Sequence, residues 1–248
     1  MPASRAAVYD YARGASGILA ACGFAESPGA HRAPYVTWIS RDGSQQKVIR
    51  TEPYSPLLCA AAPDGSLWTA GLEMDANFRD KPEHQHGAVL RRFDPKGKPL
   101  GAWLPRSSCS DTASLVRGFL AASAEKGGWL SWSADDQGLA GTDLESTPGG
   151  EISRFLLWKA PGLESAIGAF GSMTLTAGGD VLIVIEPSNR SEAPVVVTLD
   201  RASGSWRQVR LPVKPSSPWV HLYGADEGIA AVTSSDLKPG LRFFRFEK

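Results

Sequence analysis

The sequence predicts an all-β protein, specifically a β-propeller of four-stranded antiparallel blades. The first observation is a recurring phrase: an apolar segment, a tight glycine-containing turn and a second apolar or aromatic segment, clearest at residues 57–72, LLCAAAPDGSLWTAGL. The second is its spacing of roughly 50 residues, about the length of one propeller blade. The third is the near absence of helical periodicity, because alternating apolar residues punctuated by Gly, Pro, Asp and Ser favour strands throughout.

The turn between the first two strands of each repeat sets the register of the blades. These turns lie near Gly17, Gly65, Gly128, Gly179 and Gly228. One interval is longer than the others, and we assign the excess to an insertion at residues 73–87. Because neighbouring blades share a continuous core, we predict a single domain. Its blades are expected at approximately 6–52, 57–105, 117–160, 171–212 and 219–248.

Each repeat then continues with two further strands, except the last. The predicted strand pairs are 35–40 with 46–51, 88–93 with 99–104, 138–144 with 152–158, and 195–200 with 205–211. Turn signals such as Arg41-Asp42-Gly43-Ser44 join them. The fifth repeat has only 241–247, and a short segment precedes the first apolar strand. Two interpretations stay open: a five-bladed ring with incomplete closure, or a piece of a propeller with six or more blades, which we slightly favour.

The composition limits the classes of partner. The 26 basic and 26 acidic residues cancel, and the Arg91–Arg92 pair is no basic cluster, so we expect no nucleic-acid partner. No apolar run reaches the ~18 residues of a membrane helix, and the N-terminus lacks the apolar core of a signal peptide. We therefore expect a soluble chain without membrane insertion. Its compartment stays undecided, and an extracytoplasmic location is compatible with a trimmed N-terminus.

Three cysteines are present, Cys22, Cys59 and Cys109, with none of the spacing typical of a metal site. An odd number argues against a dedicated disulfide framework. Cys22 and Cys59 lie in small, apolar strand segments, so we expect buried thiols there. If the protein is exported, a disulfide between Cys59 and Cys109 is the pairing to consider.

Two segments carry a family resemblance. APDGSLWTAG at residues 62–71 and AVLRRFDPKGKPLGAW at residues 88–103 resemble repeats of six-bladed propellers of the NHL and gluconolactonase-like (regucalcin-type) superfamily. The resemblance is strongest over residues 57–104 and implies hairpin geometry more than chemistry. Lactonases of this group hold a divalent cation near the propeller axis with Glu, Asn and Asp side chains. This sequence has no one-for-one match to that ligand set.

Carboxylates end the second strand of four of the five repeats at about the same level. They are Glu26, Glu73, Asp135 and Glu186. If these side chains converge on the axis, they form an oxygen-rich site for Ca²⁺ or another divalent cation. Asn77 and Asn189 are candidate neutral oxygen ligands. The interpretation we favour is simpler: strand ends meet water, and acidic residues are accommodated there at little cost.

The insertion at residues 73–87, EMDANFRDKPEHQHG, is the segment that the repeat explains least. On a strand, His84 and His86 would place both imidazoles on one face, as a metal site requires. No third ligand is identifiable, and a solvated surface loop is the simpler interpretation.

Three functions follow from these patterns. The first, which we favour, is a non-catalytic binding propeller that takes a protein, peptide or glycan on its loop face. The second is a metal-dependent lactonase or hydrolase, and the third is a structural or sensor part of a larger chain. The sequence has no nucleophile elbow, P-loop or dinucleotide fingerprint, so the only cofactor we consider is a divalent cation.

Overall fold

The computed structural model of this chain describes residues 5–13, 17–26, 32–75, 87–109, 119–123, 127–134, 138–144, 153–156, 161–165, 167–175, 179–189, 191–209, 220–225, 228–233 and 240–244. In these ranges the elements are β-strands, apart from 3₁₀ turns such as η3 (Arg106–Ser108). The strands form antiparallel sheets in sequence order, which confirms the predicted β-propeller class. None of the described residues forms a helix long and apolar enough to cross a membrane.

The chain divides into two compact units. The first comprises residues 1–122, 127–132 and 141–153, and the second comprises 123–126, 133–140 and 154–248. The single domain expected from the repeats stays a prediction.

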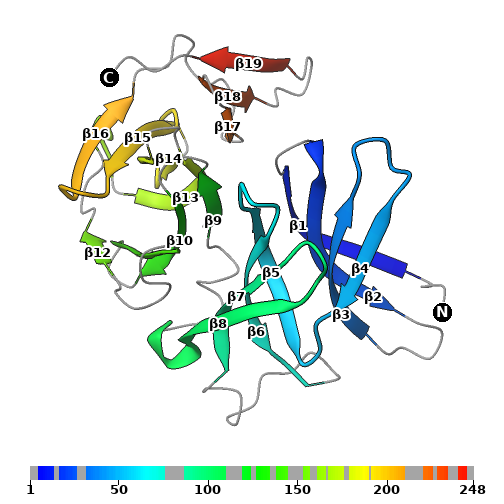
Figure 1. Cartoon of the computed structure of the whole chain (residues 1–248). Coiled ribbons are helices and arrows are strands. Elements are labelled where there is room, and N and C mark those ends of the chain that lie inside the picture. Colours follow the sequence, from blue (N-terminus) through cyan, green and yellow to red (C-terminus); the bar gives the residue numbers. More distant parts are fainter. Residues whose placement is uncertain are drawn as a thin grey trace. The chain divides into compact units, whose positions relative to one another are not determined.

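The first sheet has the order β1-β2-β3-β4 (Figure 1). Its strands are β1 (Arg5–Arg13), β2 (Leu19–Glu26), β3 (Arg32–Ile39) and β4 (Gln46–Arg50). The predicted turn at residues 41–44 joins β3 to β4. Asp42 holds this turn: hydrogen bonds from Ser40 and Ser44 lower the pKa of its carboxyl to about 2. β1 carries a bulge between Val8 and Asp10, which adds one residue to that strand.

The second sheet has the order β5-β6-β7-β8. Its strands are β5 (Tyr54–Ala61), β6 (Leu67–Glu73), β7 (Ala88–Phe93) and β8 (Pro99–Pro105). The Pro-Asp-Gly turn between β5 and β6 places Gly65 at φ 81°, where a side chain would be strained. The neighbouring Asp64 carboxylate accepts the Ser66 N–H at 3.0 Å and fixes the turn.

The first and second sheets pack face to face within the first unit. Their shared core is one cluster of buried side chains: Ala20, Cys22, Val36 and Trp38 from the first sheet, and Cys59, Leu67 and Phe93 from the second. Within the first sheet, Gly23 on β2 leaves room for the bulged β1, since an added Cβ would meet the Ala7 carbonyl oxygen at 1.9 Å.

The third sheet has the order β12-β11-β10-β9, and its residues are divided between the two units. Its strands are β9 (Phe119–Ser123), β10 (Gly127–Ala134), β11 (Gly138–Asp143) and β12 (Ser153–Leu156). Trp129 and Trp132 of β10 are buried, as expected for aromatic residues on sheets that stack.

The second unit contains the remaining two sheets. The fourth has the order β13-β14-β15-β16 and comprises β13 (Ile167–Leu175), β14 (Val181–Pro187), β15 (Val195–Asp200) and β16 (Ser205–Val209). The last comprises β17 (Val220–Ala225), β18 (Gly228–Thr233) and β19 (Gly240–Phe244). This sheet has three described strands, as the pattern of the fifth repeat predicts.

Candidate functional site

The second strand of each blade carries the predicted carboxylates, and strand register decides which face of the sheet each one occupies. Three of these strands follow a turn glycine with positive φ: Gly17 (74°), Gly65 (81°) and Gly179 (83°). Glu73 is eight residues after its turn glycine, whereas Glu26 is nine and Glu186 is seven residues after theirs. Because side chains alternate along a strand, Glu73 occupies the opposite kind of face from the other two.

In the first two sheets, Glu26 and Glu73 lie on opposite kinds of face. Because these two faces pack against each other, both carboxylates lie on the side of one interface. Glu26 lies an even number of residues from Cys22 on β2, and Glu73 lies an even number from Thr69, the Cα partner of Cys59. Cys22 and Cys59 belong to the core cluster between these sheets. Glu26 and Glu73 therefore both point toward the interface between the first and second sheets.

Glu26 is paired with an arginine across the β2–β3 hairpin. Its Oε1 lies 2.8 Å from Arg32 Nε, and the two residues are register partners. The Arg32 guanidinium also lies 5.0 Å from the centroid of the Phe24 ring. Both side chains are partly exposed, so this pair contributes at most about 1 kcal/mol to stability.

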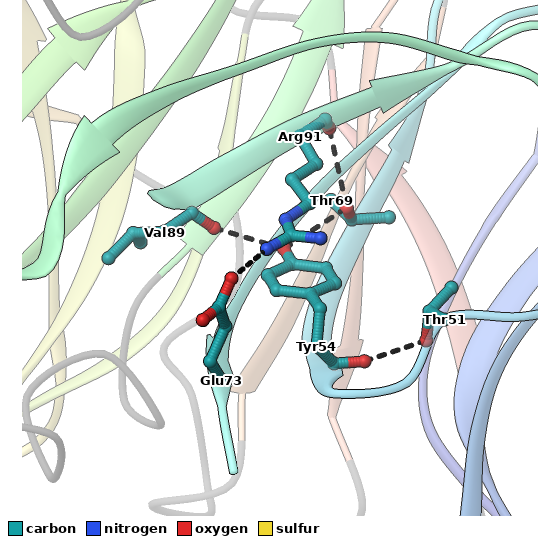
Figure 2. A network of polar contacts seen from close by, with 6 residues as sticks. All are labelled: Thr51, Tyr54, Thr69, Glu73, Val89 and Arg91. Carbon is teal, nitrogen blue, oxygen red and sulfur yellow. Dashed lines mark hydrogen bonds and ion pairs between the residues drawn. The ribbon is translucent and has the colours of Figure 1, made fainter. Parts of the chain in front are cut away.

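Glu73 belongs to a larger cluster, which we call the Arg91 network and define as Tyr54, Thr69, Glu73 and Arg91 (Figure 2). Arg91 Nη2 lies 2.5 Å from Glu73 Oε1, and the guanidinium carbon lies 4.1 Å from the centroid of the Tyr54 ring. The Tyr54 hydroxyl donates to the Val89 carbonyl at 3.0 Å and lies 3.1 Å from Thr69 Oγ1. Each charged or polar group of the network is therefore fixed by another.

Thr51, just before β5, holds the Tyr54 backbone of the network in place. The Thr51 hydroxyl donates to the Tyr54 carbonyl at 2.7 Å (Figure 2). The Tyr54 N–H donates to the Thr51 carbonyl at 2.8 Å. Burial raises the pKa of the Tyr54 phenol well above its ordinary value, although Thr69 and Arg91 oppose the shift. The phenol therefore stays a neutral hydrogen-bond donor at physiological pH.

Arg91 and Glu73 sit between core and solvent. Their side chains are 22% and 25% exposed, so a partner outside the chain can reach both. Arg91 Nε is buried and has no hydrogen-bond partner among the described residues. The arrangement offers fixed guanidinium donors beside a carboxylate acceptor at the end of β6. Such a pair can recognise a polar ligand by hydrogen bonds and charge.

The other predicted ligands are not brought to this cluster. Glu186 is half-buried on β14, in the second unit. The Asn189 side-chain oxygen accepts the Ser191 N–H at 3.1 Å and its hydroxyl at 2.8 Å, so it holds a turn. Asp135, Asn77, His84 and His86 lie outside the described residues. Within the part of the chain that the structure describes, no three His, Cys, Asp or Glu side chains are placed to share a metal ion. The cation site stays a prediction.

Neither Tyr54 nor Arg91 was among the residues predicted from sequence. The signal that identifies Arg91 is the segment VLRRF, in which two consecutive arginines interrupt a central strand. Alternation must place one of them on each face. Arg92, on the other face, lies 4.9 Å from the centroid of a Trp68 ring and donates from Nη2 to Asp64 at 2.8 Å.

Sequence comparisons identify no family: no protein-family model matches the chain. No curated protein matches it either.

Solved structures do resemble this chain. One is a puromycin hydrolase, as the S511A mutant complexed with PGG, with a TM-score of 0.53 and 13% identity. The match covers 93% of this chain and 34% of the hydrolase, so the chain spans about a third of that protein's length. Another is a puromycin-hydrolyzing peptidase of Mycobacterium tuberculosis, with a TM-score of 0.50 and 13% identity over 98% of this chain and 36% of the peptidase.

A third similar structure is the periplasmic gluconolactonase PpgL of Pseudomonas aeruginosa. Its TM-score is 0.48 and its identity 14%, over 96% of this chain and 69% of the gluconolactonase. At such identities a likeness bears on the fold alone, and the two structures with TM-scores of 0.53 and 0.50 agree with a β-propeller.

Proposed function

We propose that this chain is a non-catalytic binding propeller whose ligand contacts the blade end formed by Glu73 and Arg91. The observation that carries the proposal is the way Arg91 is held. Its guanidinium packs on a buried tyrosine ring and pairs with Glu73, while the side chain stays partly exposed. A rigid arginine loses little conformational freedom when it binds, which favours recognition.

The same contacts argue against a cation at this blade end. The strand-end carboxylates of the first two blades, Glu26 and Glu73, each have an arginine partner within 2.8 Å. A divalent cation at either carboxylate would meet a positive guanidinium a few ångströms away and would have to displace it. Binding without a metal is therefore favoured over lactonase chemistry here.

The ligand we propose is polar and is a protein, peptide or glycan. Arg91 offers donors and Glu73 an acceptor in fixed positions, which suits groups such as glycan hydroxyls or peptide carboxylates and amides. The resemblance of residues 57–104 to NHL and gluconolactonase-like repeats supports a propeller used as a scaffold. Membership of that superfamily is itself a proposal.

The experiment is a binding screen of the purified chain against a glycan array and an immobilised peptide library, followed by affinity measurements on the hits. Arg91→Ala should weaken binding of a hit at least tenfold. Arg92→Ala is the matched control, because Arg92 is the next residue of β7 but faces the other side of the sheet. Both variants are first checked for folding by circular dichroism.

Two results would contradict the proposal. One is equal loss of binding in both variants, which would place the ligand elsewhere. The other is turnover of a lactone substrate that requires a divalent cation and survives Arg91→Ala, which would favour the hydrolase.

A further inference from the structure

Two thiols face each other across the interface between the first and second sheets. Cys22 on β2 is 0% exposed and Cys59 on β5 is 2% exposed, and both belong to the core cluster between the sheets. The Cys22 side chain is the largest cause of a pKa of the Cys59 thiol well above its ordinary value, as expected for two thiols close together in that cluster. In the described structure both are free thiols.

A carboxylate of the first sheet also binds the backbone of β5 beside the two cysteines. Asp10 on β1 is the register partner of Cys22, and its Oδ2 accepts the Cys59 N–H at 2.8 Å. Its Oδ1 accepts the Tyr11 N–H, also at 2.8 Å. The bulge at residues 8–10 turns Asp10 toward the second sheet. One side chain thus ties β5 to the strand beside Cys22, so the thiols are held together by more than apolar packing.

We propose that Cys22 and Cys59 are a modification site, at which a disulfide joins the first blade to the second. The inference is independent of the ligand proposed above. The oxidant is an organic disulfide, such as oxidised glutathione or the active-site disulfide of an oxidoreductase. Two thiols lose two protons and two electrons to form one S–S bond, and the reagent disulfide is reduced to two thiols.

Because both thiols are buried in the folded chain, we expect the disulfide to form during folding. The Cys22 contact, desolvation and the nearby Asp10 charge all raise the pKa of the Cys59 thiol, so the reactive thiolate is scarce in the folded chain. Exchange is therefore slow once the sheets have packed and fast while the chain folds. Cys109, the partner considered from sequence, is not part of this cluster.

The test refolds the full chain from denaturant with a mixture of reduced and oxidised glutathione, and compares it with the same chain refolded under a reducing agent. Trypsin separates the three cysteines into peptides 14–32, 51–79 and 107–117, so mass spectrometry identifies any pairing directly. We expect a 14–32/51–79 cross-link and one remaining free thiol. The cross-linked chain should melt roughly 10 °C above the reduced chain.

Cys109→Ser is the matched control and should form the same cross-link with the same rise in melting temperature. Cys22→Ala and Cys59→Ala should each abolish both. The reduced and oxidised wild type are one sequence, so the comparison does not depend on whether those variants fold. A cross-link that contains Cys109, or three free thiols after oxidative refolding, would overturn the proposal.

Discussion

The second and fourth sheets differ in the side chains that their inner strands bury: aliphatic ones in the fourth sheet, and a cluster that includes polar ones in the second. β14 of the fourth sheet is aliphatic and buried on both faces from Val181 to Ile185. In the second sheet, the face of β6 and β7 that meets the first sheet carries Thr69 and Arg91, with Tyr54 beside them. An aliphatic strand needs only shape to be stable, whereas a buried polar cluster is stable only when its groups are satisfied. The fourth sheet is thus stabilised by aliphatic packing, whereas this part of the second sheet also depends on polar contacts.

The largest expected effect is at Tyr54. Tyr54→Ala removes a fully buried ring together with its hydroxyl contacts, and should lower the free energy of unfolding by about 4 kcal/mol. Ile183→Ala in the fourth sheet should cost about 3 kcal/mol through its cavity alone. Urea unfolding measures both.

Conservative variants sharpen this difference. Tyr54→Phe should still cost about 1–2 kcal/mol, because the Val89 carbonyl and Thr69 hydroxyl lose a partner. Ile183→Val should cost about 1 kcal/mol. If Tyr54→Phe has no measurable cost, the polar cluster contributes nothing beyond packing.

The next effect concerns the Glu73–Arg91 pair. Arg91→Ala should cost about 2 kcal/mol, since it removes a cation that packs on a buried ring. A double-mutant cycle with Glu73→Gln should give a coupling energy of about 1 kcal/mol, a value kept modest because about a quarter of each side chain is exposed. Coupling indistinguishable from zero would mean that the pair is not rigid.

A smaller effect is expected at high pH. The folded state raises the pKa of Tyr54, so its contribution to stability is complete below the unfolded pKa of about 10 and is lost as pH rises above it. Between pH 8 and pH 11, the wild type should therefore lose more unfolding free energy than Tyr54→Phe. Tyr11→Phe, at a residue 57% exposed, should keep the wild-type slope. Equal slopes in all three proteins would contradict burial of the Tyr54 phenol.

The smallest effect is expected at Glu186. We find no ion-pair partner for it within the described residues, and Glu186→Gln should change the unfolding free energy by less than about 0.5 kcal/mol. A loss above 1 kcal/mol would show that this strand end is as tightly organised as that of Glu73.

The positions of the strands could be predicted from the sequence, because turn residues and the alternation of apolar side chains determine local structure. Gly65 and Asp64 define their turn whatever packs on it, and the four-stranded order follows from short connections. The face of the sheet on which Glu73 lies could not be predicted from the sequence, because one residue more or fewer after the turn glycine moves the side chain to the other face. Arg91 was missed for a related reason: its partner Tyr54 is far away along the chain. The Cys22–Cys59 contact depends on how two sheets pack.

The most direct test of whether Arg91 occupies the place of a cation at this blade end is thermal melting of the wild type with Ca²⁺, Mg²⁺, Mn²⁺ or Zn²⁺ at millimolar concentration, against the same protein in chelator. The guanidinium beside Glu73 predicts a melting temperature that stays within about 1 °C in every case. A saturable rise of several degrees that Glu73→Gln abolishes would contradict this account and establish Glu73 as a metal ligand.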